Sequence, residues 1–309
     1  MQTRLLKHTD LTVSRACFGT MTFGAQVKEP DALRMIERCR EAGVNFFDTA
    51  PVYNQGASEE ILGRALAGRR QEVVLATKVR PPLTRAAILA SRDESLRRLQ
   101  TSFIDVYYLH QPDHQTPLEE TLATMDELVR SGKVRYPASS NYAAWQVVRM
   151  LHQAQHPAWI TQPMYNLIAR GIEQEYLPMC RAFGVATIVY NPLAGGLLTG
   201  KQPVEAPLAG TRFDANPMYL NRYWHAENFA ALAGLRAAAE SAGRSLVSLA
   251  LNWLLHHTPI DGLILGASSL AQLEENLAAL EEGPLPAEAL EACEQAWARL
   301  RGVVPKYNR

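Results

Sequence analysis

The chain alternates short apolar or β-branched runs with longer segments of helical period, and it does so eight times. This alternation predicts parallel strands joined by helices through right-handed crossovers. Eight such units with nothing left for a second core favour a closed (β/α)8 TIM barrel, because an open doubly wound sheet usually has fewer. We therefore expect one domain over residues 1–309. The predicted strands are 16–19, 44–48, 73–77, 104–109, 134–138, 159–162, 185–190 and 262–265.

Three segments fall outside the repeated units. Residues 3–14 have the pattern of a β-hairpin, which we expect to close the bottom of the barrel. Residues 202–228 form a long polar loop after the seventh strand, and residues 284–309 contain a last helix and a tail. Loops this long in a compact domain are usually functional, often as lids.

Charge and cysteine content exclude several classes of protein. The 31 Lys and Arg residues balance the 31 Asp and Glu residues, so the chain lacks the positive charge that dominates nucleic-acid binding. No apolar run reaches the roughly 18 residues of a membrane span, and the first residues lack a signal-peptide pattern, so we expect a cytoplasmic protein that does not bind membranes. The four cysteines are far apart, which indicates reduced packing residues rather than disulfides or a zinc site.

Polar residues stand where the predicted strands end, and in a barrel all eight of these ends open onto one face. The strand ends are 22 to 32 residues apart, which fits one strand–helix unit each. An acid, an amine, an imidazole and several amides should therefore meet in space, which is the composition of an active site rather than of an aliphatic core. These residues are Asp48, Lys78, His110, Ser140, Asn141, Gln162, Tyr190 and Asn191.

Tyr53 follows Asp48 closely and should overhang the same mouth. A phenol is a poor acid at neutral pH, but a neighbouring Lys78 ammonium lowers its pKa, and Asp48 would compensate the buried ammonium. His110 could orient a substrate oxygen or share in the proton transfer. Taken singly, these residues have structural readings: a cap, a surface charge, a satisfied histidine and a packing aromatic. Their joint placement on one rim of the barrel favours a catalytic role over these structural ones.

Residues 191–202 are the most phosphate-like segment of the chain. They nearly satisfy the G-x-x-x-x-G-K-[ST] pattern, but Gln202 stands where the hydroxyl that binds Mg²⁺ should be. We therefore expect a backbone cradle for a pyrophosphate, with Lys201 as counter-charge, rather than a nucleotide-hydrolysing site. Residues 266–276 offer a second cradle in which Ser268 or Ser269 caps a helix, and a plain helix cap is the alternative reading. Because G-x-G-x-x-G is absent, a dinucleotide would be held without a Rossmann unit.

Four motifs resemble the signature of the aldo-keto reductases, which are (β/α)8 enzymes that use NADPH. The motifs are Asn45–Tyr53, Leu75–Lys78, Tyr108–Asp113 and Ser139–Asn141. The second half of the chain is most similar to the aflatoxin aldehyde reductase, or succinic semialdehyde reductase, branch of that superfamily. The segments that carry this similarity are 191–201, 221–224, 253–257, 264–269 and 281–285.

The resemblance implies a role for each matching residue. Tyr53 would donate the proton to the carbonyl oxygen, with Lys78 and Asp48 as its activators and His110 orienting the substrate. Residues implied to bind the cofactor are Met21, Asp48, Ser140, Asn141, Gln162, Tyr190, Asn191, Pro192, Leu193, Gly195, Gly196, Gly200, Lys201, Arg212, Gly266, Ser268, Ser269, Gln272, Glu275 and Asn276. Residues implied to contact substrate are Tyr53, His110, Arg222, Tyr223 and Arg309.

The implied activity is NADPH-dependent reduction of aldehydes, or of ketones, to alcohols. Many relatives present Lys and Arg to the 2′-phosphate where this chain has Gly266 and Gln272. A preference for NADPH over NADH must then depend on Arg212, the serine pair and the helix N-terminus. Arg222 and Arg309 suggest a short carboxylated aldehyde such as succinic semialdehyde, or a dicarbonyl, as substrate. The branch also suggests a homodimer.

Two rival functions fit parts of the sequence. A nicotinamide-binding redox sensor similar to the β subunits of voltage-gated potassium channels would carry the same four catalytic-type residues, so motifs do not separate it from an enzyme. Turnover would separate them. A metal-dependent barrel hydrolase needs clustered ligands, whereas His256 and His257 are adjacent on a predicted helix and point apart.

Overall fold

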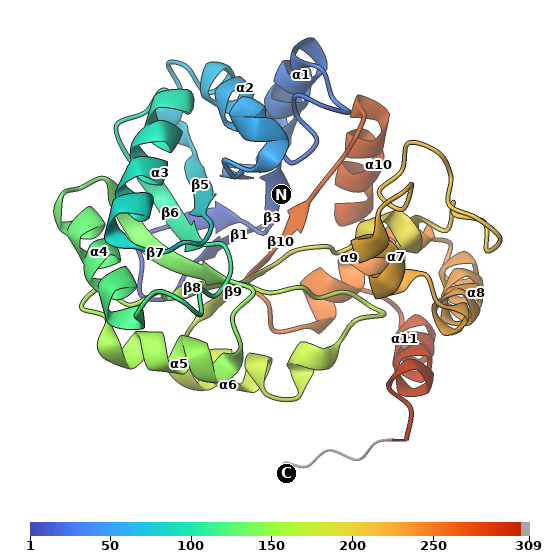
Figure 1. The fold of residues 1–309 in the computed structure, drawn as a ribbon. Helices are drawn as coiled ribbons and strands as arrows, with labels where there is room; N and C mark the ends of the chain where they lie inside the picture. Colours follow the sequence, from blue (N-terminus) through green and yellow to red (C-terminus); the bar gives the residue numbers. More distant parts are fainter. Residues whose placement is uncertain (304–309) are drawn as a thin grey trace. The chain divides into compact units, whose positions relative to one another are not determined.

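The computed structural model describes residues 1–303 of the chain. Within them, eight parallel strands close into a barrel in the order β10, β3, β4, β5, β6, β7, β8, β9 (Figure 1). The prediction of a (β/α)8 barrel is confirmed, and the strands differ from those expected only at their ends. They are β3 (Ala16–Gly19), β4 (Phe46–Asp48), β5 (Val74–Val79), β6 (Ile104–Leu109), β7 (Val134–Ser140), β8 (Ile160–Gln162), β9 (Ala186–Val189) and β10 (Gly262–Leu265).

The described chain divides into two compact units. Unit 1 comprises residues 1–163, 175–189 and 261–274 and holds the whole barrel, and unit 2 comprises residues 164–174, 190–260 and the chain from residue 275. A single domain stays a prediction. The helices are α1 (Glu29–Glu41), α2 (Ala57–Ala65), α3 (Arg85–Arg98), α4 (Leu118–Arg130), α5 (Ala144–Gln153), α6 (Tyr176–Phe183), α7 (Pro217–Tyr223), α8 (Ala226–Ser241), α9 (Leu246–His257), α10 (Leu270–Leu280) and α11 (Ala287–Arg301). Short 3-10 helices are η1 (Tyr53–Gly56), η2 (Arg70–Glu72), η3 (Gly171–Glu173) and η4 (Ala194–Thr199).

The barrel core follows the two-residue period of its strands. Alternate residues of each strand enter one buried cluster, as Val74 and Ala76 do in β5 and Val106 and Tyr108 do in β6. Because successive side chains of a strand point to opposite faces, the next residue of the same parity also belongs to the inner face. Continuing the period from these pairs gives Lys78 and His110, so the polar strand ends form the top layer of the barrel interior.

The opposite end of the barrel is closed by the N-terminal hairpin. Strands β1 (Thr3–Leu5) and β2 (Thr12–Ser14) pair antiparallel, as the sequence predicted. The hairpin side chains of Leu6, Leu11 and Val13 are at most 2% exposed and belong to the barrel core cluster. Burying them stabilises the fold by roughly 1.5–3 kcal/mol per side chain.

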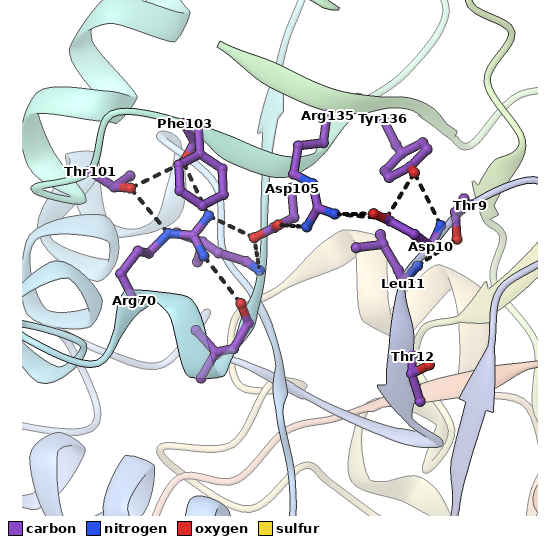
Figure 2. A network of polar contacts seen from close by, with 12 residues as sticks. Thr9, Asp10, Leu11, Thr12, Arg70, Thr101, Phe103, Asp105, Arg135 and Tyr136 are labelled. Carbon is purple, nitrogen blue, oxygen red and sulfur yellow. Dashed lines mark hydrogen bonds and ion pairs between the residues drawn. The ribbon is translucent and has the colours of Figure 1, made fainter. Parts of the chain in front are cut away.

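A buried aspartate in unit 1 connects three segments (Figure 2). The Asp105 carboxylate, on β6, accepts hydrogen bonds from Arg70 Nη2 at 2.6 Å, Arg135 Nη1 at 2.6 Å and the Leu75 amide at 2.9 Å. Arg135 continues to the exposed carboxylate of Asp10 in the hairpin turn, at 2.7 Å and 2.8 Å. The network therefore joins β5, β6 and β7 to the hairpin by charge-assisted bonds.

The segment after the seventh barrel strand is more ordered than the sequence suggested. Residues 202–228 were expected as loop, but they contain α7 and the start of α8. Pro217 stands in the first turn of α7, where proline suits a helix start, and the two aromatic residues of this helix, Tyr219 and Tyr223, are buried. Among residues 1–303, no helix has the length and apolarity that a membrane crossing requires.

Removing the buried carboxylate should destabilise the protein far more than removing the exposed one. Asp105→Ala leaves two guanidinium groups without their shared partner, so we expect a loss of about 3 kcal/mol or more in the free energy of unfolding. Asp10→Ala removes only an exposed pair and should cost less than about 1 kcal/mol. Urea unfolding of both variants measures the difference, and equal losses would contradict the assignment of Asp105 as the centre of the network.

Candidate active site

A buried ion pair occupies the mouth of the barrel. Asp48 ends β4 and Lys78 lies near the end of the neighbouring β5, and the two side chains are 3% and 0% exposed. Lys78 Nζ donates to Asp48 Oδ1, to the Thr49 carbonyl at 3.0 Å and to Tyr53 Oη at 3.4 Å. An ammonium group has three N–H bonds, so these three acceptors use all of them and fix its orientation.

The charge on Lys78 is maintained by its surroundings. Burial acts to lower the pKa of Lys78, but the Asp48 carboxylate and Tyr53 raise this pKa above its ordinary value. The group is therefore an ammonium at neutral pH. A positive charge in contact with a phenol favours the phenolate, which is the condition for a tyrosine to act as a proton donor near neutral pH.

Gln162 completes the environment of Asp48. Its Nε2 donates to Asp48 Oδ2 at 2.9 Å, and both residues are buried. A carboxylate only accepts hydrogen bonds, so the amide must present its nitrogen here and keep its oxygen for another donor. The Ser140 hydroxyl donates to the Gln162 carbonyl at 3.0 Å and ties the ends of β7 and β8 together.

Tyr53 is held over the mouth by a constrained turn. Asn54 and Gln55 have left-handed φ values of 51° and 58°, which few residues other than glycine adopt without support. The Asn54 amide supplies that support by donating to the carbonyls of Met21 at 3.0 Å and Phe23 at 2.6 Å. Sequence reasoning did not find Asn54 or the Thr49 carbonyl, because a backbone acceptor and a turn-stabilising amide have no distinctive spacing.

His110 follows β6 and faces Tyr53 edge-on, with the ring centres 6.2 Å apart. Burial, and after it the positive charges of Lys78 and Arg80, together lower the pKa of His110 to about 3. The imidazole is therefore neutral at physiological pH. Its Nδ1 is buried and has no hydrogen-bond partner among residues 1–303, while the Asn141 amide donates to the His110 carbonyl at 2.9 Å.

The comparisons with known proteins agree with this geometry. Residues 15–298 match the aldo/keto reductase family. The chain belongs to that family. Human aflatoxin B1 aldehyde reductase member 2 is 39% identical over 94% of this chain and 88% of its own length. A probable voltage-gated potassium channel subunit beta from rice is 35% identical, over 92% of this chain and 93% of its own length.

The holo form of aldo-keto reductase AKR11C1 from Bacillus halodurans has a TM-score of 0.80 and 32% identity, with 96% of each chain covered. The resemblance inferred from the motifs, including its aflatoxin aldehyde reductase branch, is confirmed. This aldo/keto reductase is accordingly an oxidoreductase enzyme, and its family uses a nicotinamide cofactor. Within residues 1–303, no cluster of His, Cys, Asp or Glu is arranged to hold a metal ion.

The glycine segment of unit 2 forms a tight turn in this reductase. Gly195, Gly196 and Gly200 all have left-handed φ values, and a Cβ on Gly195 would lie 2.7 Å from the Tyr219 ring. The Gly195 amide donates to Asn191 Oδ1 at 3.1 Å, and the Gly196 and Gly200 amides donate to carbonyls of the same turn. The structure thus uses these three N–H groups internally rather than presenting them as the expected cradle, and phosphate binding by this segment stays a prediction.

Lys201 ends this turn as an exposed side chain. Its Nζ lies 3.2 Å from Glu275 Oε2, so two residues predicted to bind the cofactor form an ion pair with each other. Arg212 donates from Nη1 to the Tyr219 hydroxyl at 3.3 Å. Both cations belong to unit 2, where Lys201 is exposed and Arg212 is partly buried.

The N-terminus of α10 has the features expected of the second anion site. The Ser269 hydroxyl accepts the Gln272 amide at 3.3 Å, so Ser269, rather than Ser268, is the helix cap. Gln272 Oε1 accepts from the Ser268 amide and hydroxyl, each at 2.9 Å. The first turn of α10 contains no acidic residue, which leaves its positive end uncompensated and suited to an anion.

Of the predicted substrate residues in unit 2, Tyr223 is buried and Arg222 is partly buried. Tyr223 is 1% exposed, and its hydroxyl accepts from the Asn166 and Asn191 amides at 3.1 Å and 3.2 Å. Arg222 lies 5.9 Å from the Tyr219 ring centre in a cation–π contact. Arg309 lies outside the described residues. Contact of these residues with substrate stays a prediction.

The residues of unit 1 fit the carboxamide end of a nicotinamide. Gln162 keeps its side-chain oxygen as an acceptor for an amide N–H, and Ser140 and Asn141 are hydrogen-bonded to each other at 3.0 Å beside it. Among the other predicted cofactor residues, Tyr190 and Gly266 are partly buried, Met21 is exposed and Asn276 is buried. Pro192 and Leu193 precede η4 in the glycine turn.

The neutral state of His110 should be visible by NMR. The ring should remain unprotonated from pH 8 down to about pH 5, since its pKa lies near 3 in the folded chain. In urea the same ring should titrate near pH 6.5. Because the unfolded chain then binds a proton that the folded chain rejects, His110 stabilises the fold above about pH 6.5, and this contribution is lost as the pH falls toward 3. Protonation of the folded ring near pH 6.5 would contradict this electrostatic account.

Proposed function

We propose that this chain is an NADPH-dependent reductase of aldehydes, and of some ketones, in which Tyr53 protonates the carbonyl oxygen. The observation that carries the proposal is the contact of the Lys78 ammonium with the Tyr53 hydroxyl at 3.4 Å, while Asp48 and Thr49 fix the other two N–H bonds. Several similar proteins are named as aflatoxin B1 aldehyde reductases, which supports the choice of substrate class.

The residues of the mouth have distinct tasks in this reaction. When bound, the nicotinamide supplies the hydride for the carbonyl carbon. As the C=O bond becomes a C–O bond, Tyr53 Oη gives its proton to the oxygen and becomes a phenolate stabilised by Lys78. Neutral His110 offers an N–H to the same oxygen and orients it without competing for the proton. Asp48 keeps Lys78 charged throughout.

The cofactor residues follow the family resemblance. Ser140, Asn141 and Gln162 would hold the carboxamide, and Tyr190 would lie against the ring. The phosphates would be held by Lys201, Arg212 and the N-terminus of α10 with Ser268 and Ser269. A third phosphate adds about two negative charges, and Arg212 with the uncompensated start of α10 supports the choice of NADPH over NADH.

Short carboxylated aldehydes, such as succinic semialdehyde, are the proposed preferred substrates, with dicarbonyls as a further class. Arg222 and Arg309 would bind the carboxylate by charge-assisted hydrogen bonds. A cytoplasmic location, predicted from the sequence, and a homodimer, suggested by the resemblance to this branch, stay predictions.

A redox-sensing role is the second candidate, because two plant potassium channel β subunits are 35% and 34% identical to this chain. Such a protein would bind the nucleotide and turn over very slowly, so kinetics of the isolated chain separate the two candidates.

The test is NADPH oxidation by the purified chain with succinic semialdehyde and, as a matched neutral aldehyde, butanal. We expect rapid turnover, a lower KM for the carboxylated aldehyde, and weaker activity with NADH. Tyr53→Phe should bind NADPH with an affinity within about threefold of wild type and lose on the order of 10²–10⁴-fold in kcat, because only the proton donor is removed.

Each part of the proposal has its own contrary result. A wild-type kcat in Tyr53→Phe would contradict the assignment of Tyr53 as the proton donor. Tight NADPH binding with negligible turnover of every aldehyde would favour the sensor. Equal KM values for the two aldehydes would contradict the proposed binding of the carboxylate by Arg222 and Arg309. So would a lower KM for succinic semialdehyde that persists in both Arg309→Ala and Arg222→Ala.

A further inference from the structure

Unit 1 contains a cavity of about 320 Å³ that the reaction does not use. It lies among the loops after β5, β6 and β7 and the first turns of α4 and α5, and none of the four catalytic-type residues lines it. Leu83, Pro112, Pro117 and Met150 give it an apolar wall. Its volume is at the lower end of the range of small-molecule sites, which suits a ligand of one or two rings.

The cavity carries a large aromatic side chain that the fold leaves exposed. Trp145, in the first turn of α5, is 66% exposed although it is the largest apolar residue type. One turn later, Arg149 pairs with Glu119 at 3.0 Å across the rim. An exposed indole beside a cavity with one apolar wall offers a flat stacking surface to a ligand.

Tyr142 supplies an unused hydrogen-bond donor to the same cavity. Its side chain is 8% exposed, lines the cavity, and makes no hydrogen bond with any residue of the described chain 1–303. Burial raises the pKa of Tyr142, so its hydroxyl keeps its proton at neutral pH. Because it makes no hydrogen bond within the described chain, this hydroxyl is free to donate to an acceptor on a ligand in the cavity.

The charged groups of the cavity are already compensated. The Asp113 carboxylate accepts from the Leu83 amide at 2.7 Å, the Gln115 amide at 2.8 Å and the Thr116 hydroxyl at 2.7 Å. Arg149 is neutralised by Glu119. A charged ligand would therefore have to break existing pairs, whereas a neutral one would not.

We propose that this cavity binds a neutral, planar aromatic molecule of one or two rings that carries a hydrogen-bond acceptor. Its ring stacks on Trp145 against the apolar wall, and its acceptor receives the Tyr142 hydroxyl. This site is separate from the barrel mouth and does not depend on the proposed reductase activity.

Coumarin, a neutral two-ring lactone with a carbonyl acceptor, is a suitable probe. Saturation-transfer NMR and calorimetry on the full chain, with and without saturating NADP⁺, should show binding with a Kd near or below about 1 mM. δ-Valerolactone lacks the aromatic ring and naphthalene lacks the acceptor, so both should bind more weakly. Tyr142→Phe should weaken coumarin binding about 3- to 10-fold, and Trp145→Ala at least about 5-fold.

Two controls separate this site from the reaction. Leu5→Ala removes another exposed apolar side chain, 58% exposed in β1, and should leave coumarin binding unchanged. Tyr53→Phe should bind coumarin as wild type does, whatever its turnover. The proposal is overturned if wild type binds no coumarin at about 5 mM, or if Tyr142→Phe and Trp145→Ala both bind it with the wild-type Kd.

Discussion

The buried pair of Asp48 and Lys78 is the interaction on which the chemistry of this reductase depends. Two buried charges are unfavourable unless each is paired and hydrogen-bonded, and here every N–H of the ammonium has an acceptor. The pair forms because β4 and β5 are neighbours in a closed parallel barrel whose inner side chains recur every second residue. The same closure that builds the apolar core therefore brings the charges together at its mouth.

The electrostatics of the mouth also decide what its histidine can do. Burial and the Lys78 and Arg80 charges lower the pKa of His110 to about 3. The Lys78 ammonium therefore disfavours a protonated His110, while it favours the phenolate of Tyr53. Burial and the Lys78 charge together thus separate the tasks of two neighbouring groups. Tyr53 is left as the proton donor, and His110 is left as a neutral hydrogen-bonding group.

Much of this arrangement could be predicted from the sequence because it is periodic. The strand pattern gave the barrel, and polar residues at strand ends gave Asp48, Lys78 and His110, since all strand ends of a barrel share a face. The Thr49 carbonyl and the bond from Gln162 to Asp48 could not be predicted, because a backbone acceptor and a side-chain rotamer leave no pattern in the sequence. Residues 191–201 looked like a phosphate cradle, yet three of their glycine amides close the turn on itself.

The cavity beside α4 and α5 is a second feature that could not be predicted from the sequence. Tyr142 and Trp145 follow the Ser-Asn motif, and Trp145 lies in the first turn of α5. Tyr142 is buried and Trp145 is exposed, and neither property can be predicted from residue type alone. Three-dimensional placement, rather than composition, is what identifies a binding surface there.

The protonation state of Lys78 tests the central claim most directly. In protein labelled with ¹⁵N-lysine, the Lys78 Nζ signal should remain that of an ammonium beyond pH 10.5, the ordinary pKa of lysine. In Asp48→Asn it should become that of a neutral amine at a lower pH than in wild type, because burial then acts without the compensating carboxylate. A neutral amine at pH 8 in wild type, or the same titration in both proteins, would contradict the account.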